Sequence, residues 1–459
     1  MRDLAYDFAA NAARVKYSDL PADTVAITKK FVLDTLATAL AGSSAPGCQA
    51  VAEYVKDGGG KKESTVLVYG GKVLAAEAAL ANGTMAHALD FDDTHDEAVL
   101  HANVSVLPAA LAMAERQGNI IGKDFITAMA IGVDVASRVA LGATGILTWA
   151  LTSTAGFFGA AAASGKILGL DEDKILHAMG IAYSQCAGNI QCLLDGALVK
   201  RMQPAFAARA GVQSALLAER GLTGSKNIFE GKFGYYTIYH NGKYDRQLVT
   251  AGLGKKFEGN NLSVKLYPAC RYTHASIDAT LGLVRENDIK PEDVVEVCAH
   301  LTQAAYNSVG RPFEIRDNPQ VDAQFSVPYT VALAITRRDV FIDDFFAQNI
   351  RSNTSIQELA KKVKVFIDQE LVGKGLTPCV IEIKTKSGKV YSRKVEVLTG
   401  SPQKPASMED IANKLRKCIP FSAKPISKAK VEKLIETVTN LENVSNINDV
   451  VRLAVGRAA

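Results

Sequence analysis

The chain has 459 residues, of which 48% are hydrophobic and 22% charged, and its formal net charge is +4. This length exceeds one small core, so we expect two or three domains in a protein of ordinary soluble globular composition. The small net charge argues against a nucleic-acid partner, and an N-terminus without the apolar core of a signal peptide predicts a cytoplasmic protein. Seven scattered cysteines without C-x-x-C spacing argue against a disulfide framework or a zinc ribbon.

The first half of the chain predicts a series of helices. Apolar residues recur at helical spacing from Pro21 to Leu40, and Gly42 ends the pattern. Further helices are predicted over residues 74–89, 107–116, 125–136, 160–168, 175–186 and 205–220. Short turns separate them, so residues 1–264 are predicted to form one all-helical domain.

One stretch of this domain, from Val139 to Gly165, has no charged residue and is long enough to cross a bilayer. It consists largely of Gly, Ala, Ser and Thr, which contribute little transfer free energy and allow helices to approach closely. We therefore expect a buried helical core here and no membrane partner.

The pattern changes after residue 264. Val294–Leu301 and Cys379–Thr385 are rich in β-branched residues, and Ser387-Gly388 joins the second of them to another strand as a hairpin. With helices expected over 274–286, 328–335 and 355–364, residues 265–402 are predicted to form a smaller α+β domain. Ser407 and Asp410 then predict a capping box, from which the C-terminal helices of 403–459 return to the helical domain. The fold class is therefore mostly α.

Titratable residues are most concentrated between His87 and His101. Five carboxylates, three imidazoles and one hydroxyl occur within these fifteen residues, between Ala-rich segments. Groups so close together in an apolar setting perturb one another's pKa values, which is typical of a site that moves protons. An exposed acidic turn is the alternative interpretation.

The same segment also fits a metal site. Asp92, Asp93 and Asp96 have the D-D-x-x-D spacing that binds magnesium and diphosphate, since carboxylate oxygens suit that ion. Such sites need a second acidic motif, and Asp343-Asp344 lacks a third acid. We therefore expect no metal, although a metal-dependent enzyme stays an alternative. Residues 159–166 resemble a phosphate loop, but the second glycine comes one residue late and Ile167 replaces the Ser/Thr, so helix packing is predicted.

Cationic and aromatic residues elsewhere are candidates for binding an anion. Lys200 and Arg201 precede an apolar helix, where they are either exposed or hold an anionic substrate. Arg271 can bind a carboxylate through two hydrogen bonds and His274 can transfer a proton, at the point where the predicted domains meet. Tyr329 follows a proline at a predicted helix start and alone indicates only a packing residue.

Together these segments resemble the MmgE/PrpD family, whose members include 2-methylcitrate dehydratase, cis-aconitate decarboxylase and iminodisuccinate epimerase. The resemblance extends along nearly the whole chain, with its motifs in the family's order. The motifs are His87-Ala-Leu-Asp-Phe-Asp-Asp-Thr94, Val106-Leu-Pro-Ala-Ala-Leu111, Gly156-Phe-Phe-Gly-Ala-Ala-Ala-Ala163, Lys200-Arg201, Gly221-Leu-Thr-Gly224, Tyr267-Pro-Ala-Cys-Arg-Tyr-Thr-His274 and Phe325-Ser-Val-Pro-Tyr329. It implies a large helical domain with a smaller α+β lid, a homodimer, and catalysis without a metal or organic cofactor.

The resemblance also implies an active site. Its catalytic residues are Asp90, His101, Lys200, His274 and Tyr329. Thr94 and Arg271 join Lys200 as substrate-binding residues. We expect His101 to be the leading acid or base, with Asp90 fixing its tautomer or orientation.

The remaining roles follow the same chemistry. Lys200 and Arg271 are expected to hold substrate carboxylates, and Thr94 and Tyr329 to supply hydrogen bonds. His274 is expected to be the second proton-transfer group.

One departure concerns substrate choice. Many family members have His-Pro-Thr before the Gly/Ala-rich helix, where this chain has Ala150-Leu151-Thr152, and Gln203 stands where a histidine is common. We therefore expect poor turnover of 2-methylcitrate and of cis-aconitate, with a different carboxylate preferred.

The predicted function is a cofactor-independent lyase that abstracts a proton next to a carboxylate of a small di- or tricarboxylic acid, as 2-methylcitrate dehydratase does. A reaction like that of cis-aconitate decarboxylase or iminodisuccinate epimerase is the alternative within the family. A metal-dependent enzyme that uses the Asp/His cluster, or a non-catalytic carboxylate-binding protein, are the alternatives outside it.

Overall fold

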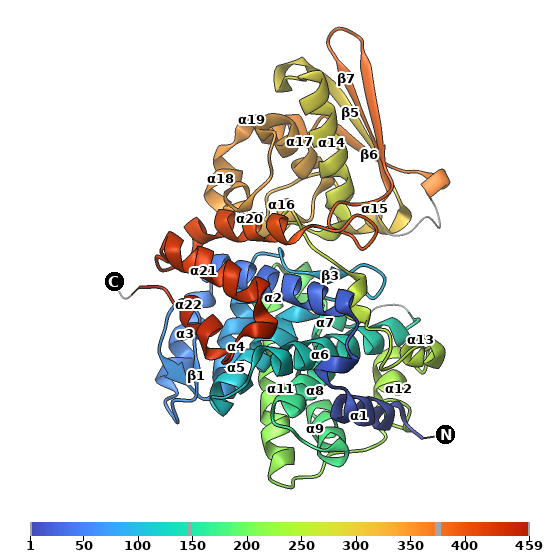
Figure 1. Cartoon of the computed structure of the whole chain (residues 1–459). Helices are drawn as coiled ribbons and strands as arrows, with labels where there is room; N and C mark the ends of the chain where they lie inside the picture. Colours follow the sequence, from blue (N-terminus) through green and yellow to red (C-terminus); the bar gives the residue numbers. More distant parts are fainter. Residues whose placement is uncertain (1, 146–147, 372–377, 458–459) are drawn as a thin grey trace. The chain divides into compact units, whose positions relative to one another are not determined.

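The computed structural model describes residues 2–145, 148–371 and 378–457, and helices dominate it (Figure 1). The chain divides into two compact units. Unit 1 comprises Met1–Ala88, Asp92–Leu262 and Ser407–Ala459, and unit 2 comprises Leu89–Phe91 and Ser263–Ala406. The prediction of a mostly α protein is confirmed.

Unit 1 is built from helices, and short strands are its minor component. Its α-helices are α1 Leu4–Arg14, α2 Ala22–Gly42, α3 Cys48–Asp57, α4 Ala75–Ala86, α5 Asn103–Gln117, α6 Gly122–Gly142, α7 Leu151–Thr154, α8 Gly156–Ile167, α9 Glu172–Tyr183, α10 Gln191–Leu194, α11 Gln203–Glu219, α12 Tyr235–His240, α13 Arg246–Thr250, α20 Met408–Cys418, α21 Lys428–Thr439 and α22 Asn448–Leu453. Its 3-10 helices are η1 Tyr17–Asp19, η2 Leu198–Met202, η3 Glu258–Asn261, η8 Ile419–Phe421 and η9 Leu441–Asn443. Strand β1 Ser64–Thr65 pairs with β2 Lys72–Val73, β3 is Thr94–His95, and β4 Leu262–Ser263 lies where the chain passes from unit 1 to unit 2.

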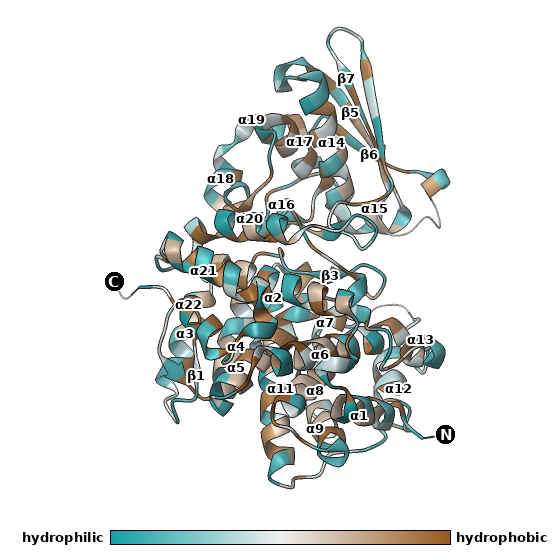
Figure 2. Cartoon of the chain, viewed as in Figure 1, coloured by the Kyte–Doolittle hydropathy of each residue, from teal (hydrophilic) through white to brown (hydrophobic). Residues whose placement is uncertain are grey.

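Helices α8 and α11 form the centre of unit 1, where α8 packs against α5, α6, α9 and α11. Figure 2 shows the apolar residues along them in brown. Helices α6 and α8 cross at glycines, since a Cβ on Gly159 would lie 2.5 Å from the carbonyl oxygen of Gly132. The small residues of the charge-free stretch therefore permit close helix packing, as predicted.

Residues 139–165, which carry no charge and are long enough for a membrane span, do not form one continuous helix. Helix α6 ends at Gly142 and α7 begins at Leu151. Two residues of the stretch, 146 and 147, lie outside the described part of the chain. By length and composition α6 could cross a membrane, but 94% of its most apolar window is buried inside the protein.

The C-terminal segment packs on the N-terminal helices of unit 1 (Figure 1), because α20 and α21 both contact α2. The predicted capping box starts α20. Ser407 Oγ accepts from the Asp410 N–H at 3.1 Å, and the Asp410 carboxylate accepts from the Ser407 N–H at 2.8 Å. Inside this contact Lys414 Nζ bonds Asp34 Oδ1 at 2.7 Å, with both side chains buried.

Unit 2 contains a four-stranded sheet in the order β6-β5-β7-β8, with β5 and β6 parallel and the other pairs antiparallel. The strands are β5 Val294–Leu301, β6 Val363–Ile367, β7 Cys379–Thr385 and β8 Val390–Val395. Its α-helices are α14 His274–Asn287, α15 Gln303–Val309, α16 Pro319–Gln324, α17 Val327–Arg337, α18 Ala347–Ser352 and α19 Thr354–Ala360, with 3-10 helices η4 Arg271–Thr273, η5 Pro291–Asp293, η6 Ile342–Phe345 and η7 Gln369–Leu371.

Alternate residues of β5 and β7, such as Val297, Ile381 and Ile383, point into an apolar core, where α14 packs against β7 and β8. The predicted helix over 355–364 is wrong at its end. Helix α19 ends at Ala360, and Val363 begins β6, because these residues pair in parallel with β5. A short segment whose apolar pattern also fits a helix can therefore become a strand when it pairs with a distant strand.

Candidate functional site

The acidic segment predicted from the sequence forms an irregular loop between α4 and α5. His87 is the C-cap residue of α4. A β-bridge between His95 and Leu100 then folds the chain back, with the His95 N–H donating to the Leu100 carbonyl at 2.7 Å. This turn returns His101 to the neighbourhood of the residues that precede it.

Asp92 lies between two imidazoles. Its Oδ2 is 2.9 Å from His87 Nδ1 and 3.0 Å from His101 Nδ1. We call these three residues the His–Asp–His cluster. Burial alone would raise the pKa of Asp92, but the two imidazoles hold it well below its usual value. Asp92 is therefore an ionised carboxylate inside the protein.

The hydrogen bonds of His101 determine its tautomer. Nδ1 also lies 2.6 Å from the backbone carbonyl oxygen of Asp93, which can only accept. Nδ1 must therefore carry a proton, which leaves Nε2 as the atom that gains or loses one. The side chain of His101 is 19% exposed, so the ring is accessible to a solute.

This geometry corrects one prediction. The carboxylate that contacts His101 Nδ1 is Asp92, whereas Asp90 was predicted to orient this ring. Asp90 and Asp92 are two residues apart in an irregular loop, where side-chain directions follow no period that the sequence reveals. His87, which shares Asp92 with His101, was not predicted as a site residue.

Asp93 supports the loop from the other side. Its Oδ2 accepts from the N–H groups of Ala102 and Asn103, at 3.2 and 3.4 Å, at the beginning of α5. Burial and the neighbouring charge of Asp92 raise the pKa of Asp93 to about 7. The pKa values of these two adjacent aspartates are therefore shifted in opposite directions, because only the Asp92 carboxylate lies so close to both imidazoles.

Lys200 belongs to the same neighbourhood of unit 1. It lies in η2, half-buried. Its positive charge helps to lower the pKa of His87, and it opposes the rise that burial causes in the pKa of Cys192. Burial, the largest cause, together with that charge lowers the pKa of His87 to about 4, so His87 is a neutral imidazole. The structure therefore places the predicted cation near the predicted base.

The His–Asp–His cluster also has the composition of a metal site. One ligand atom from each of its three residues lies within 4.8 Å of the others. Two imidazoles and one carboxylate suit a transition metal better than magnesium. The D-D-x-x-D interpretation fits less well, because the Asp93 carboxylate is engaged by backbone N–H groups of α5.

Unit 2 contains the other predicted charged residues. Lys265 Nζ donates to the carbonyl oxygen of Asp90 at 2.9 Å and to its Oδ2 at 3.1 Å, and both side chains are buried. Asp90 has φ +53°, which aspartate tolerates better than most residues. Lys265 was missed because nothing in its sequence context marks it as buried.

His274 lies near this pair, and its Nε2 is 3.3 Å from the Ala269 carbonyl. Burial and the charges of Arg271 and Lys265 hold the pKa of His274 well below its usual value. His274 is thus a neutral imidazole whose Nε2–H donates to the Ala269 carbonyl, and its role as a second proton-transfer group stays a prediction. Arg271, in η4, supplies positive charge to unit 2.

Tyr329 is completely buried in the apolar core of unit 2. Its hydroxyl donates to the Asp344 carbonyl at 3.0 Å, and its ring packs against Phe313. This environment is that of a packing residue and gives no support to the predicted catalytic role. Gln324, which directly precedes the motif of Phe325 to Tyr329, joins two loops of unit 2: its Nε2 donates to the carbonyls of Leu89 and Pro268 at 2.9 and 2.8 Å.

The segment aligned with the family's His-Pro-Thr lies beside His101. Thr152 Oγ1 accepts from the backbone N–H of His101 at 3.1 Å, and Ala150 is the N-cap residue of α7. Gln203 is buried and bonds both the N–H and the carbonyl of Asn189, at 2.6 and 2.9 Å. Through these two bonds Gln203 holds the loop that precedes Lys200. Thr94 is buried in β3.

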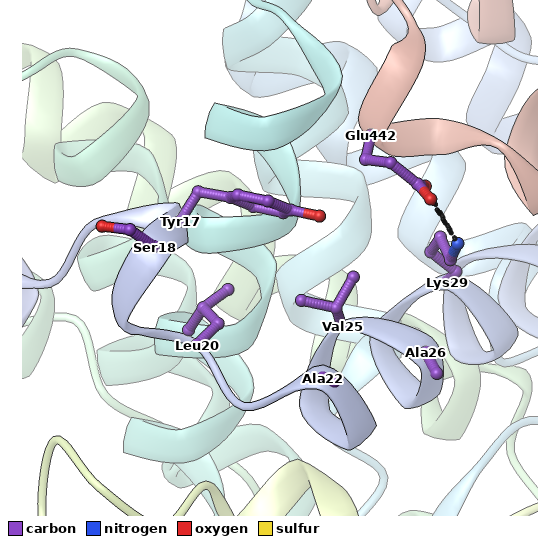
Figure 3. A pocket seen from close by; sticks show the side chains of 8 residues that line it. All are labelled: Tyr17, Ser18, Leu20, Ala22, Val25, Ala26, Lys29 and Glu442. Carbon is purple, nitrogen blue, oxygen red and sulfur yellow. Dashed lines mark hydrogen bonds and ion pairs between the residues drawn. The ribbon is translucent and has the colours of Figure 1, made fainter.

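A surface pocket of about 400 Å³ lies elsewhere in unit 1, around the beginning of α2 (Figure 3). Its wall includes Tyr17, Val25 and the ion pair of Lys29 with Glu442, 2.9 Å apart. None of the predicted site residues lines it.

Comparisons with known proteins agree with the resemblance. The model of the MmgE/PrpD N-terminal domain matches residues 6–247, and that of the MmgE/PrpD C-terminal domain matches residues 267–443. Cis-aconitate decarboxylase-like protein oryM of Aspergillus oryzae is 28% identical over 96% of this chain and 95% of its own. The cis-aconitate decarboxylases of Aspergillus terreus and Homo sapiens are 27% and 26% identical, over 96% and 99% of this chain and 94% and 95% of theirs.

Proposed function

The chain belongs to the MmgE/PrpD family, and on this premise we propose that it is a cofactor-independent decarboxylase of a small unsaturated polycarboxylic acid. The family is enzymatic, so the prediction that the chain is an enzyme is confirmed. The relatives named as cis-aconitate decarboxylases favour decarboxylation over the predicted dehydration of 2-methylcitrate.

The observation that best supports this proposal is the state of His101. Its Nδ1–H is held by Asp92 and by the Asp93 carbonyl, while the ring remains partly exposed. An ionised carboxylate on Nδ1 stabilises the imidazolium, so Nε2 can hold a proton and deliver it.

Decarboxylation has a simple balance of electrons and protons. Loss of carbon dioxide leaves the electron pair of the broken C–C bond on the substrate, and a carbon of the remaining unsaturated system then takes one proton. We assign that proton to His101 Nε2, which regains it from solvent. Lys200 would bind a substrate carboxylate and stabilise the developing negative charge.

The remaining predicted features are also proposals. Asp90, Thr94 and Arg271 stay candidates for substrate contact, and His274 for a neutral hydrogen-bond donor. From the family resemblance we propose a cytoplasmic homodimer.

A panel of di- and tricarboxylic acids, with products detected by NMR, tests the function. We expect one unsaturated acid to lose carbon dioxide, and His101→Ala to lower kcat by a factor of about 10²–10⁴ with the fold intact. The matched control is His300→Ala, which removes a partly exposed histidine of β5 and should leave kcat unchanged. Dehydration or epimerisation of the preferred acid would contradict the decarboxylase assignment.

The metal-dependent alternative is favoured by one observation, the closeness of the ligand atoms in the His–Asp–His cluster. We expect a chelator to leave the activity of the purified protein unchanged, because acid–base chemistry at His101 needs no Lewis acid. Loss of activity on chelation, restored by zinc or another divalent metal, would favour the metal-dependent enzyme. Tight binding of a polycarboxylate without turnover across the panel would favour a non-catalytic binding protein.

A further inference from the structure

His87 has no role in the proposed decarboxylation, although it contacts the same carboxylate oxygen as His101. Its side chain is only 3% exposed. The two imidazole rings lie 5.1 Å apart with their planes at 60°. Since a side chain so deeply buried is unsuited to touch a substrate, its effect on the reaction should pass through Asp92.

We propose that His87 is a positioning residue, which holds the Asp92 carboxylate in the orientation where Oδ2 bonds His101 Nδ1. The proposal rests on the proposed function, in which His101 is the acid–base group. It assigns different tasks to two histidines that share one carboxylate.

The hydrogen bonds of Asp92 support this proposal. A carboxylate rotates about its Cβ–Cγ bond unless several donors hold it. Asp92 Oδ1 is buried and has no hydrogen-bond partner among the described residues. Oδ2 receives His87 Nδ1 at 2.9 Å and His101 Nδ1 at 3.0 Å. Without His87, the side-chain hydrogen bond left to Asp92 among the described residues would come from His101, which is the residue that Asp92 is meant to orient.

The surroundings of the two rings explain why they are not interchangeable. His87 is enclosed in the protein, and the positive charge of Lys200 further disfavours its protonated form. A neutral imidazole that faces an ionised carboxylate donates one N–H, here from Nδ1. His101 is partly exposed, so the proton that the reaction uses stays on His101 while His87 remains a fixed donor.

Three substitutions at position 87 test the proposal by kinetics. His87→Asn keeps an N–H donor near the place of Nδ1, His87→Gln moves the donor one bond further, and His87→Leu removes it. We expect Leu and Gln to lower kcat about 10²-fold with KM within about twofold, and Asn to retain most of kcat, because a small misplacement of a reacting group costs about this much. If Gln or Leu keeps the kcat of the unmodified protein, or if Asn loses as much as Leu, the proposal is wrong. Should the Leu variant fail to fold, the comparison of Gln with Asn decides.

A spectroscopic measurement tests the same point without a substrate. The proton on His101 Nδ1 resonates at low field when it donates to an ionised carboxylate, and its signal is assigned by its loss in His101→Ala. We expect this low-field signal in the unmodified protein and in His87→Asn, and a shift to higher field in His87→Gln and His87→Leu. An unchanged signal in all three variants would overturn the positioning role. If no acid of the panel is turned over, the proposed function fails while this measurement still decides the role of His87.

Discussion

At the scale of single residues, three neighbouring acids of the motif have three different environments. Asp90 bonds the buried ammonium of Lys265, Asp92 lies between two imidazoles, and Asp93 faces the N-terminus of α5. The pKa of Asp92 is lowered and that of Asp93 is raised to about 7, although both are fully buried. Burial alone therefore does not determine the charge of an acid here. At Asp92 the two imidazoles outweigh the effect of burial on the pKa, whereas at Asp93 burial prevails.

Ala150 gives a prediction at this scale. It is the N-cap residue of α7 and lies two residues before Thr152, which accepts from the backbone N–H of His101, so position 150 belongs to the segment that contacts His101. A site that hydrogen-bonds a substrate group discriminates strongly through that bond. We expect the unmodified protein to turn over cis-aconitate and 2-methylcitrate poorly. In Ala150→His, the ratio of kcat/KM between cis-aconitate and the preferred acid should change by about tenfold or more.

The control for this prediction is Ala150→Leu, which adds volume without a hydrogen-bond donor. Assays of both acids with all three proteins separate the two effects. Efficient turnover of cis-aconitate by the unmodified protein would show that Ala150 does not limit specificity, and an equal change in the Leu variant would show that volume matters more than the donor.

At the scale of elements, the small residues of the charge-free stretch allow close helix packing. A Cβ at Gly159 in α8 would lie 2.5 Å from the Gly132 carbonyl oxygen in α6 and 2.8 Å from the Ala136 side chain. Backbone of a neighbouring helix cannot move aside as a flexible side chain can. The crossing of α6 and α8 therefore requires glycine at this position.

We expect Gly159→Ala to lower the free energy of unfolding by about 1–3 kcal/mol, the usual cost of overpacking a core. Urea denaturation measures this change. The control is Gly58→Ala at the end of α3, where φ is −62° and a Cβ would have its nearest contact at 3.7 Å. That substitution should leave stability unchanged or raise it slightly. Equal stability of the two variants would show that the crossing tolerates a wider separation.

At the scale of the whole molecule, the C-terminal segment completes unit 1. Helix α20 packs on α2, and the contact encloses the ion pair of Lys414 with Asp34, whose side chains are 4% and 0% exposed. Two charges so far apart in the sequence meet only when the chain has folded back on itself. Removing one of them leaves the other buried without its partner.

Lys414→Met should therefore destabilise the protein by about 3–5 kcal/mol. Removing both charges, in the double variant with Asp34→Asn, should restore part of the loss. Urea denaturation checks both, with Lys433→Met as control, since Lys433 forms an exposed pair that is worth about 1 kcal/mol or less. A loss no larger than that of the control would show that the buried pair does not hold the C-terminal segment.

The sequence by itself determined several of the longer helices and strands, and the family. Strands β5 and β7 begin and end where their β-branched pattern does, and helices such as α2 and α14 differ from prediction by two residues or fewer at each end. Local periodicity and caps suffice for these elements, because burying one face is a local requirement that repeats along the chain. The motifs likewise identified the family, since they are short and contiguous.

Only the tertiary structure decided which side chains meet. Strand β6 depends on pairing with β5, and Lys265 is buried against Asp90, 175 residues away in the sequence. The pairing of His101 with Asp92 also escaped prediction, although both residues had been singled out in the sequence. In an irregular loop no regular spacing predicts which way a side chain points. Contacts there depend on how distant segments of the chain pack, and the local sequence does not reveal them.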